Sequence, residues 1–166
     1  MILKQSFKNH LIVAEFTLTT TLMFAGAWWY FEFDPDFLLV IGIFQSLFTI
    51  PALYLHIEYY LRNRGEEIEI NADEIIVRKN GKEIKRYSSD ELEDITVYKS
   101  ASLDKGGIPL SALESYHFAR ILAKNKDEII ITCLLAPKRV EQAVKQIQGV
   151  EYFRFKTLFA TLRLKW

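Results

Sequence analysis

The chain has 166 residues, of which 50% are hydrophobic and 25% are charged, and its 21 basic and 21 acidic side chains give a formal net charge of +0. Domains that bind DNA or RNA usually carry a clear excess of positive charge, so this balance argues against a nucleic-acid partner. The single cysteine, Cys133, excludes an internal disulfide bond and a multi-cysteine metal site.

Hydrophobic residues are concentrated at the start of the chain. Residues 11–31 form an apolar run whose one charged side chain is Glu15, and residues 37–60 form a second run with charge only near its end. A helix needs about 20 apolar residues to cross roughly 30 Å of hydrocarbon, and lipid offers no hydrogen-bonding partner to an open strand. Because residues 32–36 leave room only for a turn, the sequence predicts an antiparallel transmembrane hairpin within residues 1–65.

The charges that flank the two runs predict their orientation. Basic side chains precede the first run and follow the second, at Lys4, Lys8, Arg62 and Arg64, and the turn between the runs has none. Positive charge favours the cytoplasmic side of a membrane. We therefore expect a multi-pass protein of the inner (cytoplasmic) membrane, with both termini in the cytoplasm and the acidic turn outside.

Two ionisable residues lie within the predicted spans. Glu15 is near the start of the first helix and His56 is near the end of the second, so an antiparallel hairpin places them at similar depth. They are expected either to form an intramembrane polar pair or to extend separately to the nearby interface.

From residue 66 onward the pattern changes to short alternating segments. Antiparallel strands are predicted at residues 67–70, 75–77, 82–87, 95–98, 116–122 and 129–135. The Asn80-Gly81 pair predicts a type I′ hairpin, because both residues tolerate positive φ. A helix is expected to start at Pro137 and to stop at Gly149, with one apolar face made of Val140, Ala143, Val144 and Ile147.

This order of elements is what an incomplete barrel closed by one helix requires. Residues 70–77, the Asn80-Gly81 turn, residues 89–98 and the Pro137 helix give residues 66–149 a resemblance to the bacterial membrane-anchored pleckstrin-homology-like (PH-like) domains. The resemblance implies a membrane α+β protein, in which the N-terminal hairpin precedes a PH-like antiparallel β-barrel or sandwich capped by one C-terminal helix. It also implies an interaction module.

The tail, residues 150–166, allows two interpretations. As a helix it is basic and amphipathic and suits an anionic membrane surface, with the interface residues Arg154, Lys156, Arg163, Lys165 and Trp166. Alternatively it is a last strand or helix that packs on the β domain.

We find no pattern of residues that predicts catalysis. The histidines His10, His56 and His117 are far apart in the chain and none has metal-ligand spacing, and Cys133 lies in an apolar strand. We therefore expect neither an enzyme nor a bound metal or cofactor.

The best candidate for a binding surface is a basic hairpin. It comprises Arg78, Lys79, Lys82, Lys85 and Arg86. Each surface cation near an anionic membrane is worth about 1 kcal/mol, although a charged strand face is more commonly just exposed to solvent.

Two functions from different classes remain open at this point. The first is a non-enzymatic, membrane-anchored interaction or scaffold module that presents its PH-like domain to a protein partner or to anionic lipid. The second is an oligomeric, ligand-responsive membrane effector or channel-like protein, suggested by the small and hydroxylated residues of the first span and by Glu15. Membrane lipids and a protein partner or a second copy of the chain are the expected partners.

Overall fold

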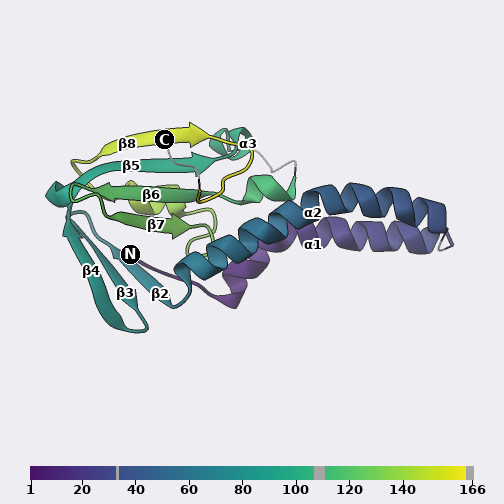
Figure 1. The fold of residues 1–166 in the computed structure, drawn as a ribbon, viewed down its shortest axis with the longest axis horizontal. Coiled ribbons are helices and arrows are strands. Elements are labelled where there is room, and N and C mark those ends of the chain that lie inside the picture. Colours follow the sequence, from purple (N-terminus) through teal and green to yellow (C-terminus); the bar gives the residue numbers. More distant parts are fainter. Residues whose placement is uncertain (33, 107–110, 164–166) are drawn as a thin grey trace.

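The computed structural model describes residues 1–32, 34–106 and 111–163, and it divides into a helical hairpin and a β domain (Figure 1). The helices are α1 (Phe7–Tyr30) and α2 (Pro35–Asn63). Ser6 caps α1 by accepting a hydrogen bond from the backbone N–H of Asn9, and Asp34 caps α2 in the same way. The two helices predicted from hydropathy are confirmed: α1 starts four residues before its predicted span and ends one residue short of it, and α2 extends beyond its span at both ends.

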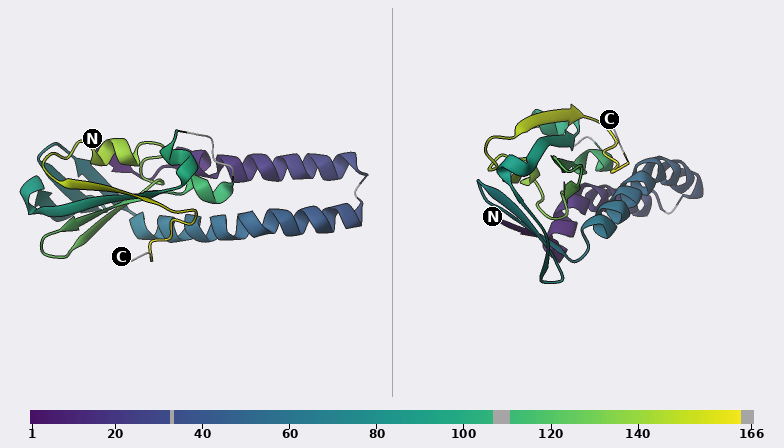
Figure 2. Two further views of the ribbon diagram at one scale, coloured as in Figure 1. Left: turned by 90° about the horizontal axis from the view of Figure 1, so that it is seen from above. Right: turned by 60° about the vertical axis from the view of Figure 1, so that its left-hand side comes forward.

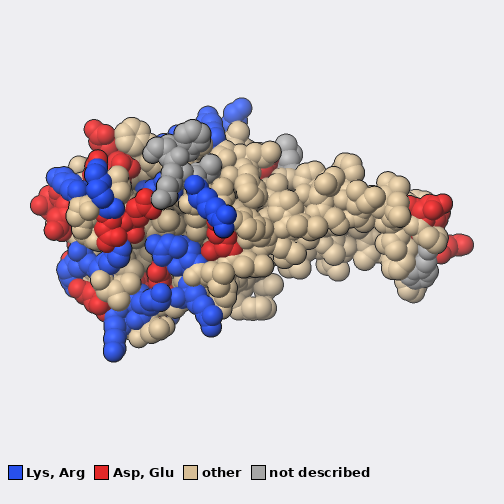
Figure 3. All heavy atoms as spheres, viewed as in Figure 1, with Lys and Arg blue, Asp and Glu red and all other residues tan. Residues whose placement is uncertain are grey.

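The hairpin exposes most of its apolar surface. Only 6% of the most apolar window of α1 and 11% of that of α2 are buried, so neither is the core helix of a globular domain. Both helices project from the same side of the β domain (Figure 2). On the face drawn in Figure 3, the stalk is uncharged from beyond its base to its tip, where acidic side chains gather. Both helices are long and apolar enough to cross a membrane.

The first sheet contains a strand that the sequence did not predict. Its order is β1-β2-β3-β4, with all pairs antiparallel, and its strands are β1 (Ile2–Lys4), β2 (Glu66–Ile70), β3 (Glu74–Lys79) and β4 (Lys82–Ser88). Because β1 precedes α1 and pairs with β2, the hairpin is an insertion between two neighbouring strands of one sheet. The β domain therefore draws residues from both sides of the expected boundary at residue 66.

The second sheet has the order β7-β6-β5-β8. Its strands are β5 (Leu92–Lys99), β6 (Phe118–Ala123), β7 (Glu128–Thr132) and β8 (Glu151–Lys156). β8 runs parallel to β5, whereas the other pairs are antiparallel. The expectation of a wholly antiparallel β domain is therefore wrong for this sheet, since the predicted α+β domain contains one parallel pair.

The tail of the chain forms β8, so the prediction of an amphipathic helix there is wrong. Tyr152 and Phe155 are half-buried and the charged side chains of the strand are exposed, which fits the edge of a sheet, and β8 pairs with β5. Of the two interpretations left open for the tail, packing on the β domain is the one that the structure has.

The turn between β3 and β4 agrees with the sequence. Asn80 and Gly81 both have positive φ, at 50° and 79°, which a type I′ turn requires. A β-bulge at Val77 and Arg78 shifts the register within the same hairpin.

The capping helix is shorter than predicted. Helix α4 covers only Val140–Val144, although the pattern predicted a helix from Pro137 to Gly149. Lys138 adopts a left-handed conformation (φ 63°), which a right-handed helix cannot contain, so the helix starts only at Val140. The remaining helical segments are short: η1 (Ser89–Glu91), α3 (Ala101–Asp104) and η2 (Ala112–Ser115).

The two sheets and α4 share one apolar core. Its fully buried branched side chains come from both sheets and from α4, and include Ile68, Ile75, Ile95, Val97, Ile121, Ile131 and Val140. Burial of each such side chain stabilises the fold by about 1.5–3 kcal/mol. The proximal part of α2 also enters this core through Leu55 and Tyr59, which are fully buried. The hairpin and the β domain are therefore packed together as one body.

Candidate functional site

Most cations of the predicted basic hairpin are neutralised by neighbouring acids. Arg78 pairs with Glu69 at 2.8 Å, Lys85 pairs with Asp127 at 2.6 Å, and Arg86 pairs with Glu74 and Glu83, each at 2.8 Å. Hydrogen bonds from Lys85 and Tyr87 lower the pKa of Asp127. Lys79 and Lys82 face one another in register, and within the described residues neither has an ion pair. Little positive charge is therefore left for an anionic ligand at this surface.

The basic residues predicted to face a membrane from the tail are partly engaged as well. Arg154 and Lys156, on β8, form ion pairs with the acids Glu141 and Asp104. Arg163 is exposed, and Lys165 and Trp166 lie outside the described residues. The arrangement around Arg154 and Lys156 links β8 to α3 and α4.

The segment after β8 returns to α2. The Tyr59 hydroxyl donates a hydrogen bond to the Ala160 carbonyl at 2.5 Å, and the Glu58 carboxylate accepts bonds from the Thr161 hydroxyl and the Leu162 N–H at 3.2 Å. These bonds fasten the end of the chain to the base of the hairpin.

The predicted polar pair of Glu15 and His56 does not form in the described part of the chain. Thr20 and Thr21 contact Gln45, and His10 contacts His56, so residues whose numbers add to about 66 lie level in the hairpin. Glu15 is then level with Ile50 and Pro51, about 8 Å along the helix from His56 at 1.5 Å per residue. The similar depth inferred from the apolar runs was wrong by this offset.

His56 instead belongs to a chain of polar groups that joins the hairpin to the β domain. Its Nε2 lies 2.9 Å from Nδ1 of His10, and its Nδ1 lies 3.1 Å from the hydroxyl of Tyr116, beside η2. Burial raises the pKa of Tyr116, so its hydroxyl keeps its proton, and the tautomer of the His56 ring decides which of the two groups donates. The sequence does not reveal this contact, because His10 and His56 are 46 residues apart and His56 and Tyr116 are 60 residues apart.

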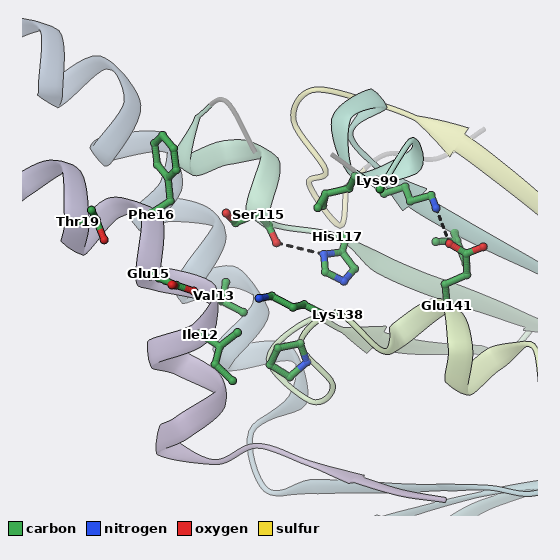
Figure 4. Close-up of a pocket in the computed structure, with 14 residues that line it drawn as sticks. Ile12, Val13, Glu15, Phe16, Thr19, Lys99, Ser115, His117, Lys138 and Glu141 are labelled. Atoms are coloured by element: carbon green, nitrogen blue, oxygen red, sulfur yellow. Dashed lines mark hydrogen bonds and ion pairs between the residues drawn. The ribbon is translucent and has the colours of Figure 1, made fainter. Parts of the chain in front are cut away.

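A cavity of about 650 Å³ lies where α1 meets the β domain. Figure 4 shows its two walls, with α1 on one side and, on the other, β5, α3, η2 and the segment that leads into α4. The α1 wall comprises Ile12, Val13, Glu15, Phe16 and Thr19, and the opposite wall includes Val97, Lys99, Leu103, Ser115, His117, Pro137, Lys138 and Glu141. Ligand sites commonly enclose about 300–1,000 Å³, so the size suits a small molecule or a headgroup.

Two charged residues that line this cavity, Lys99 and Glu141, form ion pairs with other side chains of the protein. The Lys99 side chain is 9% exposed and forms ion pairs with Asp104, at 3.0 Å, and with Glu141. Burial works against ionisation of Glu141, but hydrogen bonds from Lys145, Lys99 and Arg154 outweigh it and lower its pKa to about 2. Lys99 and Glu141 therefore belong to an ion-pair network with Asp104, Lys145 and Arg154, and their charges are engaged within the protein.

His117 contributes a neutral acceptor. Its Nδ1 lies 3.1 Å from the carbonyl oxygen of Ser115, which can only accept, so Nδ1 carries the proton and donates it. Burial lowers the pKa of His117 to about 4, and the nearby cation Lys99 acts in the same direction. The ring is thus neutral at physiological pH, with a lone pair on Nε2.

Lys138 and Glu15 are the free charges of the cavity. Figure 4 shows both side chains extending into the space between α1 and the β domain. Neither has an ion pair or a side-chain hydrogen bond among residues 1–32, 34–106 and 111–163. The cavity therefore presents one cation and one anion on opposite walls. Only Glu15 was singled out by the sequence analysis, because its charge interrupts an apolar run, whereas nothing in the local sequence marks Lys138.

Comparison with known proteins supports the resemblance seen in the sequence. A family model described as a PH domain matches residues 3–141, from β1 through the hairpin to the start of α4. No curated protein and no solved structure matches the chain. The match extends over both helices, in agreement with their insertion between β1 and β2. The chain therefore belongs to the PH domain family, whose members are lipid or protein interaction modules.

Proposed function

We propose that the protein is a non-enzymatic, membrane-anchored interaction module, in which the hairpin spans the bilayer and holds the PH domain against the cytoplasmic membrane surface. The observation that carries this proposal is the exposed apolar surface of the hairpin, whose most apolar windows are only 6% and 11% buried. Water contact with such a surface is unfavourable by about 25 cal/mol per Å², and a bilayer removes it from water. The acidic tip lies at the far end of the stalk, opposite the β domain (Figure 3).

The packing of the hairpin on the β domain fixes the orientation of the PH domain relative to its anchor. Tyr59 and Leu55 are fully buried, and His56 bonds to Tyr116 of the β domain. A PH domain joined to its anchor by a flexible linker samples many orientations, whereas this one presents a fixed face to the membrane. A fixed face supports recognition of lipid headgroups or of another membrane protein at a defined height.

Arginine substitutions in the stalk test this function. Ile43 and Leu47 are 58% and 62% exposed on α2, and each arginine near the middle of a membrane helix costs about 2.5–3.5 kcal/mol of insertion free energy. We expect the wild-type chain to stay in the membrane pellet after carbonate extraction, and Ile43→Arg/Leu47→Arg to move to the supernatant. The control is Ile84→Arg, at a site 49% exposed on β4, which should behave like the wild type. Release of the wild-type chain by carbonate would contradict membrane anchoring.

A second candidate is an oligomeric membrane effector, favoured by the open surface at two glycines. A Cβ built on Gly26 or Gly42 meets nothing within 4 Å, and Gly42 lies in a shallow groove of α2 beside Leu39, Ile43 and Ser46. Small residues let membrane helices approach closely. The mass of the detergent-solubilised particle distinguishes the candidates: a monomer that Gly42→Leu leaves unchanged rules out the oligomer.

A further inference from the structure

The cavity between α1 and the β domain lies where the inner headgroups meet the hydrocarbon if the hairpin spans the membrane as proposed. Along α1, Glu15 is about 22 Å from Tyr30 at 1.5 Å per residue, while the hydrocarbon core is about 30 Å thick. With Tyr30 at the outer interface, Glu15 lies about 8 Å inside the inner boundary of the hydrocarbon, at the level of the upper acyl region. The β domain reaches this level too, because η2 and α3 flank the cavity beside α1. A phospholipid of the inner leaflet thus meets the open side of the cavity.

The two unpaired charges of the cavity indicate a ligand that carries both a positive and a negative group. Lys138 offers an ammonium group with three donors, and Glu15 offers a carboxylate, and neither is satisfied by the described part of the protein. Lys99 and Glu141 are engaged by an ion-pair network within the protein, whereas Lys138 and Glu15 are not. An anionic ligand would leave Glu15 unpaired, and a purely cationic one would leave Lys138 unpaired. A zwitterion satisfies both.

The polar groups near these charges favour a primary ammonium over a quaternary one. The Nε2 atom of His117 is an acceptor, since Nδ1 holds the proton, and the Glu15 carboxylate also only accepts. A primary ammonium has three N–H donors for these acceptors, whereas a trimethylammonium has none. The apolar side chains Ile12 and Phe16 on the α1 wall suit the glycerol and upper acyl region of a lipid.

We infer that this cavity binds the headgroup of a zwitterionic phospholipid with a primary ammonium, that is, a phosphoethanolamine headgroup. Lys138 contacts the phosphate, and Glu15 with His117 accepts hydrogen bonds from the ammonium group. The inference rests on the proposed membrane anchoring and identifies the lipid that the module recognises. The site is separate from the predicted basic hairpin on β3 and β4, whose cations are largely paired within the protein.

Native mass spectrometry of the full chain in a non-ionic detergent tests the inference. The probes are phosphatidylethanolamine, phosphatidylcholine and phosphatidylglycerol with identical acyl chains, together with glycerophosphoethanolamine, which has none. A charge-assisted hydrogen bond is worth a factor of about ten or more in affinity, so phosphatidylethanolamine should bind about tenfold more tightly than the other two lipids. Glu15→Gln should remove the preference over phosphatidylcholine, and Lys138→Gln should weaken binding of all three lipids.

Two controls match the charge changes at sites away from the cavity. Glu32→Gln alters the exposed tip of the hairpin and Lys124→Gln alters the exposed turn between β6 and β7, and both should bind like the wild type. Equal affinities for the three lipids, tighter binding of phosphatidylglycerol, or insensitivity to both cavity substitutions overturns the inference. Equal binding of glycerophosphoethanolamine overturns a lipid as the occupant. If the same preparation floats with vesicles but shows no preference, the inference fails while the anchoring stands; failure to float removes the anchoring itself.

Discussion

Single residues at the junction have roles that their neighbours in the sequence do not reveal. Asn63, the last residue of α2, is fully buried and acts as a partner for the edge strand β7. Its amide nitrogen donates to the Ile130 carbonyl at 2.9 Å, and its amide oxygen accepts from the Thr132 N–H at 3.2 Å. Two backbone groups that would otherwise be buried without partners are thereby satisfied. The side chain of this polar residue, at the end of an apolar helix, therefore completes the hydrogen bonding of the edge strand.

Replacing Asn63 tests this role. Asn63→Ala leaves the Ile130 and Thr132 backbone groups without their side-chain partner, and it removes one of the two partners of the 8% exposed Glu66, which keeps Arg62. Each unsatisfied buried group costs about 1–3 kcal/mol, so we expect a clear loss of unfolding free energy, measured by denaturant titration in detergent. Asn125→Ala, in the exposed turn before β7, should cost much less. Similar losses for the two variants would contradict the role of Asn63.

His117 predicts a pH dependence of stability. Its folded pKa is about 4 and its usual pKa is about 6.5, so between these values the unfolded chain binds a proton that the folded chain does not. Stability should therefore be complete above pH 6.5 and should fall as the pH drops toward 4. The limit of this contribution is about 3 kcal/mol.

The variant that isolates this effect is His117→Asn, whose amide can still donate to the Ser115 carbonyl but does not titrate. The loss of unfolding free energy between pH 6.5 and pH 4 should be smaller in the variant than in the wild type. Glu141 does not interfere, because its lowered pKa, about 2, makes its own loss begin near pH 4.5 and continue below it. Parallel pH profiles for the two proteins would show that His117 is protonated equally in both states.

At the scale of elements, the helices, strands and turns that were predicted correctly are those whose sequence pattern lies within a short stretch of the chain. The two helices and the type I′ turn at Asn80-Gly81 depend on residues close together in the chain, and both are as predicted. The α4 helix was overpredicted because an apolar repeat does not show that Lys138 turns left-handed. The strand β1 was missed because three residues carry no periodic pattern, and only pairing with β2 across the whole hairpin defines it.

The hairpin as an element makes a prediction about sidedness. Cys133 is fully buried, and burial raises its pKa to about 12, so it should not react with a maleimide. Any labelling of a variant then comes from the cysteine that was introduced. Asp36→Cys, at the exposed tip, should react with an impermeant maleimide in intact right-side-out vesicles. Lys82→Cys, on the exposed end of β4, should react only after permeabilisation. Labelling of both sites from one side would show that the hairpin does not cross the bilayer.

At the scale of the whole molecule, the insertion of the hairpin between β1 and β2 determines how the parts cooperate. Two chain crossings join the stalk to one sheet, and the return of residues 157–162 onto α2 adds a third connection. The cavity lies among these connections and has walls from both parts. The shape of the cavity therefore depends on the fixed packing of the hairpin against the PH domain.

The amino-acid sequence by itself determined the features that depend on near neighbours: two apolar helices with a turn between them, a β-rich remainder, its main hairpin turn and its kinship with PH domains. It also marked Glu15, because a charge in an apolar run is visible locally. Only the tertiary structure decided that β8 pairs parallel to β5, that His10, His56 and Tyr116 meet, and that Lys138 faces Glu15 across a cavity. The physical reason is that these contacts join segments far apart in the chain, whose pairing is selected by the packing of the whole core and leaves no periodic trace in either segment.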